Sequence, residues 1–93
     1  MTASREMIIT NKVGLHARPA ANFVKCAAGF KSKITLENLD RATAPINAKS
    51  ILNVLGAGAQ KGHHVRLTAD GDDEAAAIEA LCTLISNNCG EAE

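Results

Sequence analysis

The sequence predicts an α+β domain in which a single β-sheet is covered by helices on one face. Segments that alternate polar and apolar residues, as strands do, take turns with segments whose apolar residues recur every three or four positions, as in amphipathic helices. The polar positions of two alternating segments leave one sheet face in water: Lys33, Thr35, Glu37, His64, Arg66 and Thr68. The chain has 93 residues, enough for one hydrophobic core, so we expect one domain over residues 1–93.

The composition excludes several classes of protein. A hydrophobic fraction of 46% is typical of a globular chain and argues against disorder. No apolar run approaches the roughly 20 residues that cross a bilayer, so we expect no membrane insertion. Residues 1–6 lack the pattern of a secretion signal, which predicts a cytoplasmic protein. A net charge of zero, with two Phe and no Tyr or Trp, argues against nucleic-acid binding.

The three cysteines do not form a recognisable framework. Their number is odd and no Cys-x-x-Cys pair occurs, so we expect neither a disulfide scaffold nor a structural zinc site. Cys26 and Cys82 fall within helical patterns and are predicted to lie in or near the core. Cys89, near the end of the chain, is predicted to be an exposed thiol.

The first half of the chain predicts a strand, a helix and a second strand. Met7–Thr10 is a short apolar run that we interpret as an inner strand. The helix covers 17–28, because Pro19 is tolerated only in a first turn and Gly29 is a natural stop. Its buried stripe is predicted to contain Ala20, Phe23, Val24 and Ala27. The second strand covers 33–37.

The second half predicts a short strand near 42–44, a helix over 48–55, a strand over 64–68 and a helix from about 73 to 86. Asn47 is the expected N-cap of the first of these helices. Acidic residues between 70 and 74 provide the turn and favourable charge at the start of the last helix. That helix is predicted to bury Ile78, Leu81, Leu84 or Cys82, and Ile85. The predicted order is β-α-β-β-α-β-α.

His16 stands at the junction between the first strand and the first helix. The amide groups and dipole at a helix N-terminus attract anions, phosphate included. Arg18 can add a fork of donors to phosphate oxygens. A neutral imidazole in this place has a lone pair that can attack phosphorus. A lone histidine before a helix is more often a cap or surface residue, and it is Arg18 with Pro19 that favours phosphate chemistry.

The stretch from Gly14 to Ala20 resembles the active-site motif of HPr, the histidine phosphocarrier of the phosphoenolpyruvate-dependent sugar phosphotransferase system. A second stretch, Asn47–Leu55, is similar to the short second helix of that family and its regulatory serine. The resemblance covers nearly the whole chain. It implies an open-faced β-sandwich, with a four-stranded antiparallel sheet and three helices on one face.

The resemblance also implies the roles of individual residues. His16 would accept phosphate on Nδ1 from enzyme I and pass it to the IIA domain of a sugar permease. Arg18 and the backbone amides of Ala17 and Arg18 would stabilise the phosphohistidine. Ser50 would be the site of regulatory phosphorylation by an HPr kinase/phosphorylase, with a transcriptional regulator as a further partner. The protein would be a bacterial phosphoryl relay rather than an enzyme, acting as a monomer without a cofactor.

A partner surface is expected where the first two helices meet. Small apolar and basic side chains beside a reactive histidine suit a transient interface that is dry at its centre and basic at its rim. The predicted members are Ala17, Ala21, Lys25, Lys49, Ile51, Leu52 and Leu55. A phosphate on Ser50 would add about two negative charges to this surface, which predicts inhibition by repulsion.

Other interpretations remain open. The same His16 chemistry would serve a carrier of the nitrogen-related branch or of a dihydroxyacetone kinase, and a regulatory binding module would act through the Ser50 surface. His63 and His64 are not expected to bind metal with His16, because adjacent strand residues point to opposite faces. The glycine-containing segment 56–62 lacks the spacing of a P-loop and is predicted to be a flexible connector. The acidic residues 70–74 are attributed to helix capping rather than to calcium binding.

Overall fold

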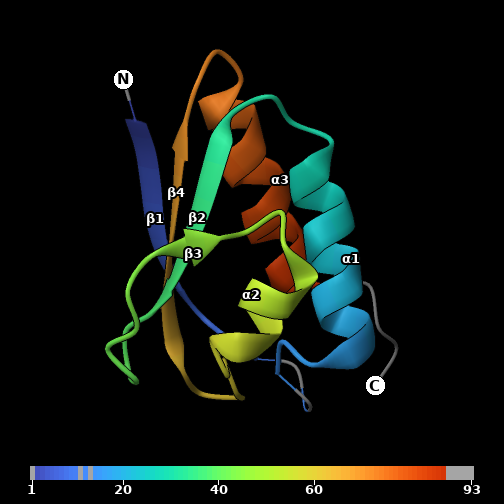
Figure 1. Cartoon of the computed structure of the whole chain (residues 1–93), viewed down its shortest axis with the longest axis vertical. Helices are drawn as coiled ribbons and strands as arrows, with labels where there is room; N and C mark the ends of the chain where they lie inside the picture. Colours follow the sequence, from blue (N-terminus) through green and yellow to red (C-terminus); the bar gives the residue numbers. More distant parts are fainter. Residues whose placement is uncertain (1, 11, 13, 88–93) are drawn as a thin grey trace.

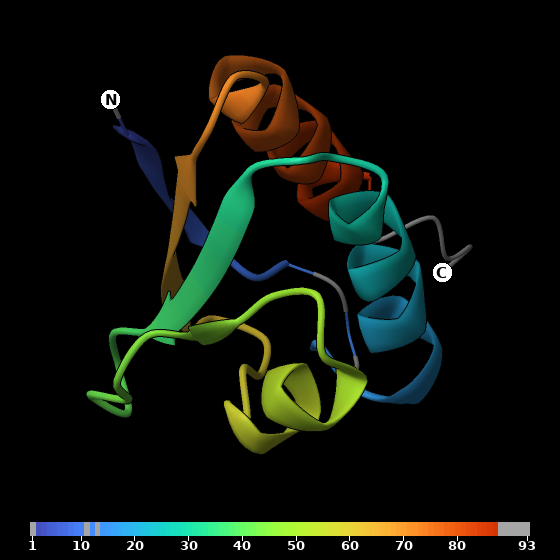
Figure 2. The same cartoon turned by 45° about the horizontal axis from the view of Figure 1, so that its top comes forward.

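A four-stranded antiparallel sheet carries three helices on one face (Figure 1). The computed structural model describes residues 2–10, 12 and 14–87. Its elements are β1 (Thr2–Ile8), α1 (Ala17–Ala28), β2 (Lys33–Asn38), β3 (Ile46–Asn47), α2 (Ile51–Gly56), β4 (His64–Asp70) and α3 (Glu74–Ser86). The strands lie in the order β1-β4-β2-β3. Figure 2 shows the helices together on one side of the sheet, so the predicted fold class is confirmed.

The core lies between the sheet and the helices. Alternate residues of β2 and β4 point toward the helices and are buried, among them Leu36 and Leu67. Helix α1 begins and ends at the predicted residues. Its stripe is confirmed for Ala20, Phe23 and Ala27, whereas Val24 is only partly buried and Pro19 is buried as well. The apolar stripe therefore fixes the orientation of the helix whose first turn follows His16.

Helix α3 closes the other half of the core. Its buried side chains include the predicted Ile78, Leu81, Cys82 and Ile85, while Leu84 is only partly buried. Cys26 is partly buried and, like Cys82, is a free thiol. Desolvation by burial raises the pKa of both thiols. Cys89 lies outside the described residues. None of the described helices is long and apolar enough to span a membrane.

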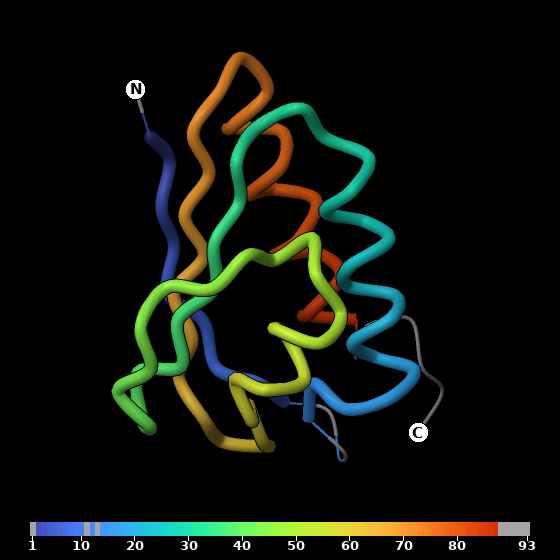
Figure 3. The backbone as a smooth tube through the Cα atoms, in the orientation of Figure 1, coloured from blue at the N-terminus to red at the C-terminus, as the bar shows by residue number. Residues whose placement is uncertain are grey.

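The first strand differs from its prediction in its residue range and in its location within the sheet. It covers Thr2–Ile8 and lies at the edge of the sheet beside β4, so the expectation of an inner strand over Met7–Thr10 was wrong. The tube in Figure 3 shows this N-terminal segment running beside residues 64–70. Backbone pairing with β4 defines the strand, and its mostly exposed side chains gave no hydrophobic signal. Ile8 is 50% exposed, because it pairs with the exposed His64 on the face of the sheet that the helices do not cover.

The segment between β2 and α2 also differs from its prediction. The short strand lies at Ile46–Asn47 rather than near 42–44, and it pairs with Thr35 and Leu36. The second helix begins at Ile51, because Ser50 is its N-cap and accepts a hydrogen bond from Asn53 N–H at 3.4 Å. The Asn47 side chain instead accepts the amide of Lys49 at 2.9 Å, a local turn that comes before the helix.

Asp73 joins the start of α3 to the segment before β2. The sequence analysis attributed residues 70–74 to helix capping, but the Asp73 side chain makes no capping hydrogen bond to its own helix. The carboxylate instead accepts the backbone amides of Lys31 at 2.8 Å and Ser32 at 2.9 Å, together with the Ser32 hydroxyl. These hydrogen bonds, with that of the Ser32 hydroxyl as the largest cause, lower the pKa of Asp73 from 3.8 to about 2.

Replacing Asp73 with asparagine is expected to lower the free energy of unfolding at neutral pH. A carboxylate whose pKa is lower in the folded state stabilises the fold fully above its unfolded pKa and loses that effect as the pH falls through the folded value. The difference between the parent protein and Asp73→Asn is therefore expected to narrow between pH 3.8 and about 2. Urea unfolding across this pH range measures it. The exposed neighbour Asp72, changed to asparagine, is the control, and an equal loss in both variants would contradict the assignment.

Candidate functional site

His16 lies immediately before α1, as predicted. It occupies the N-cap position with extended backbone angles (φ −120°, ψ 160°), and its side chain makes no capping hydrogen bond. The residue is exposed. The imidazole is thus accessible to a second protein, with the start of a helix directly behind it.

The start of α1 is arranged to face an anion. The carbonyl of His16 accepts the first helical hydrogen bond, from Ala20 N–H at 3.2 Å. Pro19 has no N–H, so the amides of Ala17 and Arg18 are the ones at the helix entrance. The first turn contains no acidic residue, and Arg18 is exposed within it. The helix dipole and the guanidinium both favour negative charge next to His16.

Ala17 has an unusual backbone conformation. Its φ angle is +27°, on the positive side that residues other than glycine rarely adopt. Such a conformation costs on the order of 1–3 kcal/mol and persists only where the surroundings enforce it. The sequence contains no signal for this feature, because alanine has no special preference for positive φ.

A pocket of about 440 Å³ opens beside His16. Its lining comes from three segments: Lys12, Leu15, His16, Leu55, Gly58, Ala59, Gln60 and Lys61. Lys12 and Lys61 add positive charge to a site that the sequence had described with Arg18 alone. Sequence reasoning assigned neither Lys12 nor the last four of these residues to the site.

The segment 58–61, which belongs to the predicted connector 56–62, is a wall of the site. Its Ala59 carbonyl accepts the amide of Leu15 at 2.8 Å. Gly14 packs so closely that a Cβ atom there would lie 2.4 Å from the Ala59 oxygen. Gly14 (φ +66°) and Gly58 (φ +62°) both have positive φ angles. These glycines were the available signal, since each permits a turn or a close approach that other residues resist.

The predicted partner-surface residues lie on α1 and around α2, two helices that contact each other. Ala17, Ala21 and Lys25 are exposed on α1. On α2, Leu52 is 78% exposed and Ile51 is 40% exposed, whereas Leu55 is partly buried.

Lys49 and Ser50 are only partly exposed. The Lys49 ammonium donates a hydrogen bond of 2.6 Å to the carbonyl of Phe30, just beyond α1. Leu52 is the most exposed of the large apolar side chains in this group.

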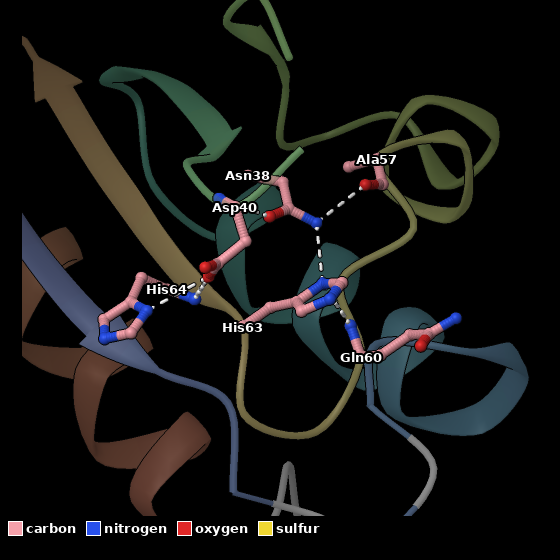
Figure 4. A network of polar contacts seen from close by, with 6 residues as sticks. All are labelled: Asn38, Asp40, Ala57, Gln60, His63 and His64. Atoms are coloured by element: carbon pink, nitrogen blue, oxygen red, sulfur yellow. Dashed lines mark hydrogen bonds and ion pairs between the residues drawn. The ribbon is translucent and has the colours of Figure 1, made fainter. Parts of the chain in front are cut away.

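His63 and His64 have partners of their own. The His63 ring lies against Asn38 and Gln60, and the His64 ring lies 3.0 Å from Asp40 (Figure 4). Asp40 also accepts the His64 amide, and these hydrogen bonds lower the pKa of Asp40. Within residues 2–10, 12 and 14–87, no group of three or more His, Cys, Asp or Glu residues is arranged to hold a metal ion.

Comparisons with known proteins give a consistent result. The family described as "PTS HPr component phosphorylation site" matches residues 3–87. Phosphocarrier protein HPr of Xylella fastidiosa is 42% identical over 86 residues, which are 92% of this chain and 93% of that protein. The multiphosphoryl transfer protein of Haemophilus influenzae is 45% identical over 83 residues, 89% of this chain. The chain covers only 17% of that longer relative.

Solved structures agree with this result. A crystal structure of HPr-C-His from Thermoanaerobacter tengcongensis has a TM-score of 0.89 and 44% identity, covering 98% of this chain and 99% of that one. The histidine-containing phosphocarrier protein of Mycoplasma has a TM-score of 0.82 and 40% identity, covering 92% of this chain and 96% of that one. With the fold and the match over residues 3–87 taken together, the chain belongs to the HPr family of phosphocarrier proteins of the phosphotransferase system.

Proposed function

We propose that this chain carries a phosphoryl group on Nδ1 of His16, taking it from phosphorylated enzyme I and passing it to the IIA domain of a sugar permease. The observation that supports this most is the exposed His16 imidazole at the entrance of α1. In each transfer the P–N bond of the donor histidine breaks as the P–N bond of the acceptor forms. The protein acts as a cytoplasmic, monomeric relay that needs no cofactor of its own.

The charges around His16 fit a transient phosphohistidine. The amides of Ala17 and Arg18 at the helix entrance can donate hydrogen bonds to phosphate oxygens, and the Arg18 guanidinium can add further donors. Lys12 and Lys61 border the adjacent pocket. These groups favour the dianion without burying it, which suits a group that must leave again for the next protein.

A phosphotransfer assay tests this function. The protein is incubated with phosphoenolpyruvate, magnesium and a bacterial enzyme I, and bound phosphate is measured by mass spectrometry after acid or alkali treatment. One phosphate per chain is expected, labile in acid and stable in alkali, as for a phosphohistidine. No uptake, or a phosphate stable in acid, would overturn the proposal.

Ser50 is the proposed regulatory site of the same surface. Its hydroxyl caps the N-terminus of α2, beside the exposed Ile51. The preceding residue, Lys49, links this position to the end of α1 by its hydrogen bond to the Phe30 carbonyl. A phosphate at an N-cap is compatible with the helix dipole, so the fold tolerates the modification. It adds negative charge where acidic partners approach, and the expected result is weaker docking of enzyme I.

Replacing Ser50 with aspartate is expected to slow phosphorylation of His16 by about tenfold, the factor that corresponds to a repulsion of about 1.4 kcal/mol. The comparison is with Ser50→Asn, because Asn and Asp are equally good N-caps and differ in charge. Phosphorylation rates with limiting enzyme I measure the effect. Equal rates for the two variants would show that charge at this position does not control docking.

A further inference from the structure

One peptide group connects the His16 segment to a second histidine. The carbonyl of Ala59 accepts the amide of Leu15, the residue before His16, at 2.8 Å. The N–H of the same peptide group belongs to Gln60 and donates to Nδ1 of His63 at 3.1 Å (Figure 4). The two ends of the Ala59–Gln60 peptide are thus held by Leu15 on one side and the His63 ring on the other.

The hydrogen-bond partners of His63 fix which ring nitrogen lacks a proton. A backbone N–H can only donate, so Nδ1 must accept from Gln60. The side chain of Asn38, which is fully buried, supplies a second donor, with its Nδ2 atom 3.1 Å from the same nitrogen.

The orientation of the Asn38 amide follows from its other partners. Its Oδ1 accepts the amide of Asp40 at 3.2 Å, and its Nδ2 donates to the carbonyl of Ala57 at 3.0 Å. A reversed amide would place two donors together at Asp40 and two acceptors together at Ala57. The His63 ring therefore accepts through Nδ1 and carries its proton on Nε2.

A tight turn of four residues, 60–63, directly follows this peptide. His63 N–H donates to the carbonyl of Gln60 at 2.9 Å, and Gly62 has a φ angle of +90°, as expected for the third residue of a type II turn. The start of this turn also supports the segment before α1, because Gly14 packs directly against Ala59 and Gln60. A rotation of the Ala59–Gln60 peptide would therefore release Leu15 and move the backbone on which His16 is carried.

We propose that His63 is a positioning residue for phosphoryl transfer at His16, acting through the Ala59–Gln60 peptide and Leu15. This rests on the proposed function of His16. The role requires an unprotonated acceptor at the Nδ1 position and does not require a histidine as such. Nδ1 is engaged within the fold by Asn38 and Gln60, and His63 belongs to neither α1 nor α2, where partners are proposed to dock. Its loss is therefore expected to slow the transfer step and to leave partner binding unchanged.

Two substitutions of His63 separate positioning from general stability. His63→Asn keeps an acceptor near the Nδ1 position through its side-chain oxygen. His63→Leu removes the acceptor and replaces the ring with an apolar side chain. His64→Leu is the matched control, because the neighbouring imidazole contacts Asp40 and does not contact the Gln60 amide. In His63→Leu, kcat for phosphorylation by enzyme I is expected to fall about five- to tenfold with little change in KM. His63→Asn is expected to restore most of this loss.

Nuclear magnetic resonance tests the same arrangement without the transfer reaction. In the parent protein, ¹⁵N shifts of His63 at neutral pH are expected to show the proton on Nε2. In His63→Leu, amide hydrogen exchange of Leu15 is expected to be about tenfold faster.

The outcomes distinguish this proposal from the proposed function. A parent protein that takes up no phosphate overturns the function of His16, whatever His63 does. Normal uptake by the parent protein, with His63→Leu and His64→Leu equally fast, overturns the positioning role alone. A proton on Nδ1 of His63, or unchanged Leu15 exchange in a folded His63→Leu variant, also overturns it.

Discussion

Replacing His16 with alanine is expected to abolish phosphate uptake while leaving the fold intact. The proposed phosphoryl acceptor is the imidazole nitrogen Nδ1, and alanine has no atom that can replace it. The His16 side chain is exposed and makes no capping hydrogen bond, so its removal is expected to change the free energy of unfolding by less than about 0.5 kcal/mol. Mass spectrometry of the acid-labile phosphate and urea unfolding measure the two effects separately.

His64→Ala is the matched control for this substitution. It removes another exposed imidazole, on β4, whose partner is Asp40. Phosphate uptake by this variant is expected to equal that of the parent protein. If acid-labile phosphate persisted in His16→Ala and disappeared in His64→Ala, the phosphoryl acceptor would be His64, and the assignment to His16 would be overturned.

Replacing Gly14 with alanine is expected to damage both stability and phosphate uptake. The new Cβ atom would lie 2.4 Å from the Ala59 oxygen and 2.8 Å from the Gln60 Cα atom, and both are backbone atoms that cannot swing aside. The φ angle of +66° adds a further cost for any residue with a side chain. We expect a loss of about 2–4 kcal/mol in the free energy of unfolding, together with a phosphorylation rate that is at least about tenfold lower.

Gly56→Ala is the control for the effect of glycine removal itself. Gly56 ends α2, and a Cβ atom there would meet nothing within 4 Å. Alanine is expected to leave stability unchanged or raise it by up to about 1 kcal/mol. Urea unfolding and enzyme I-dependent rates for the two variants decide the matter. If Gly14→Ala were as stable and as active as Gly56→Ala, the close packing of Gly14 against Ala59 would not hold in solution.

The parts of the fold that were predictable are those encoded by local pattern. Pro19 and Gly29 located the two ends of α1 correctly, because a proline restricts where a helix can begin and a glycine favours its end. The recurrence of Ala20, Phe23 and Ala27 located its buried face. The alternation in β2 and β4 is equally local, since each strand has one buried and one exposed face.

The parts that were mispredicted depend on pairing or on competition between neighbouring side chains. β1 is a strand because β4 binds it, and its exposed side chains do not reveal this. Asn47 and Ser50 can both cap a helix, and propensity alone does not choose between them. The structure assigns Asn47 to a turn at Lys49 and Ser50 to the helix.

The candidate site divides in the same way. His16, Arg18 and Pro19 are adjacent in sequence and were recognised from it. The wall at Ala59 is brought to Leu15 by tertiary structure, and the positive φ angle of Ala17 is not one that alanine favours by itself. Neither feature can be predicted from the residues on either side of His16. The motif therefore identifies the candidate residue but does not reveal the tertiary contacts around it.

The position of β4 between β1 and β2 also has a consequence for the order in which the chain can fold. Thr2 pairs with Asp70, and Leu15 bonds to Ala59, so the N-terminal segments are completed by contacts from far along the sequence. Folds dominated by such distant contacts fold slowly, since large loops must close before the contacts form. During translation, when the residues of α1 have left the ribosome, β4, which pairs with both β1 and β2, has not yet been synthesised. The proposed phosphoryl acceptor, His16, is therefore synthesised before β4, and we expect it to become competent only after β4 has emerged.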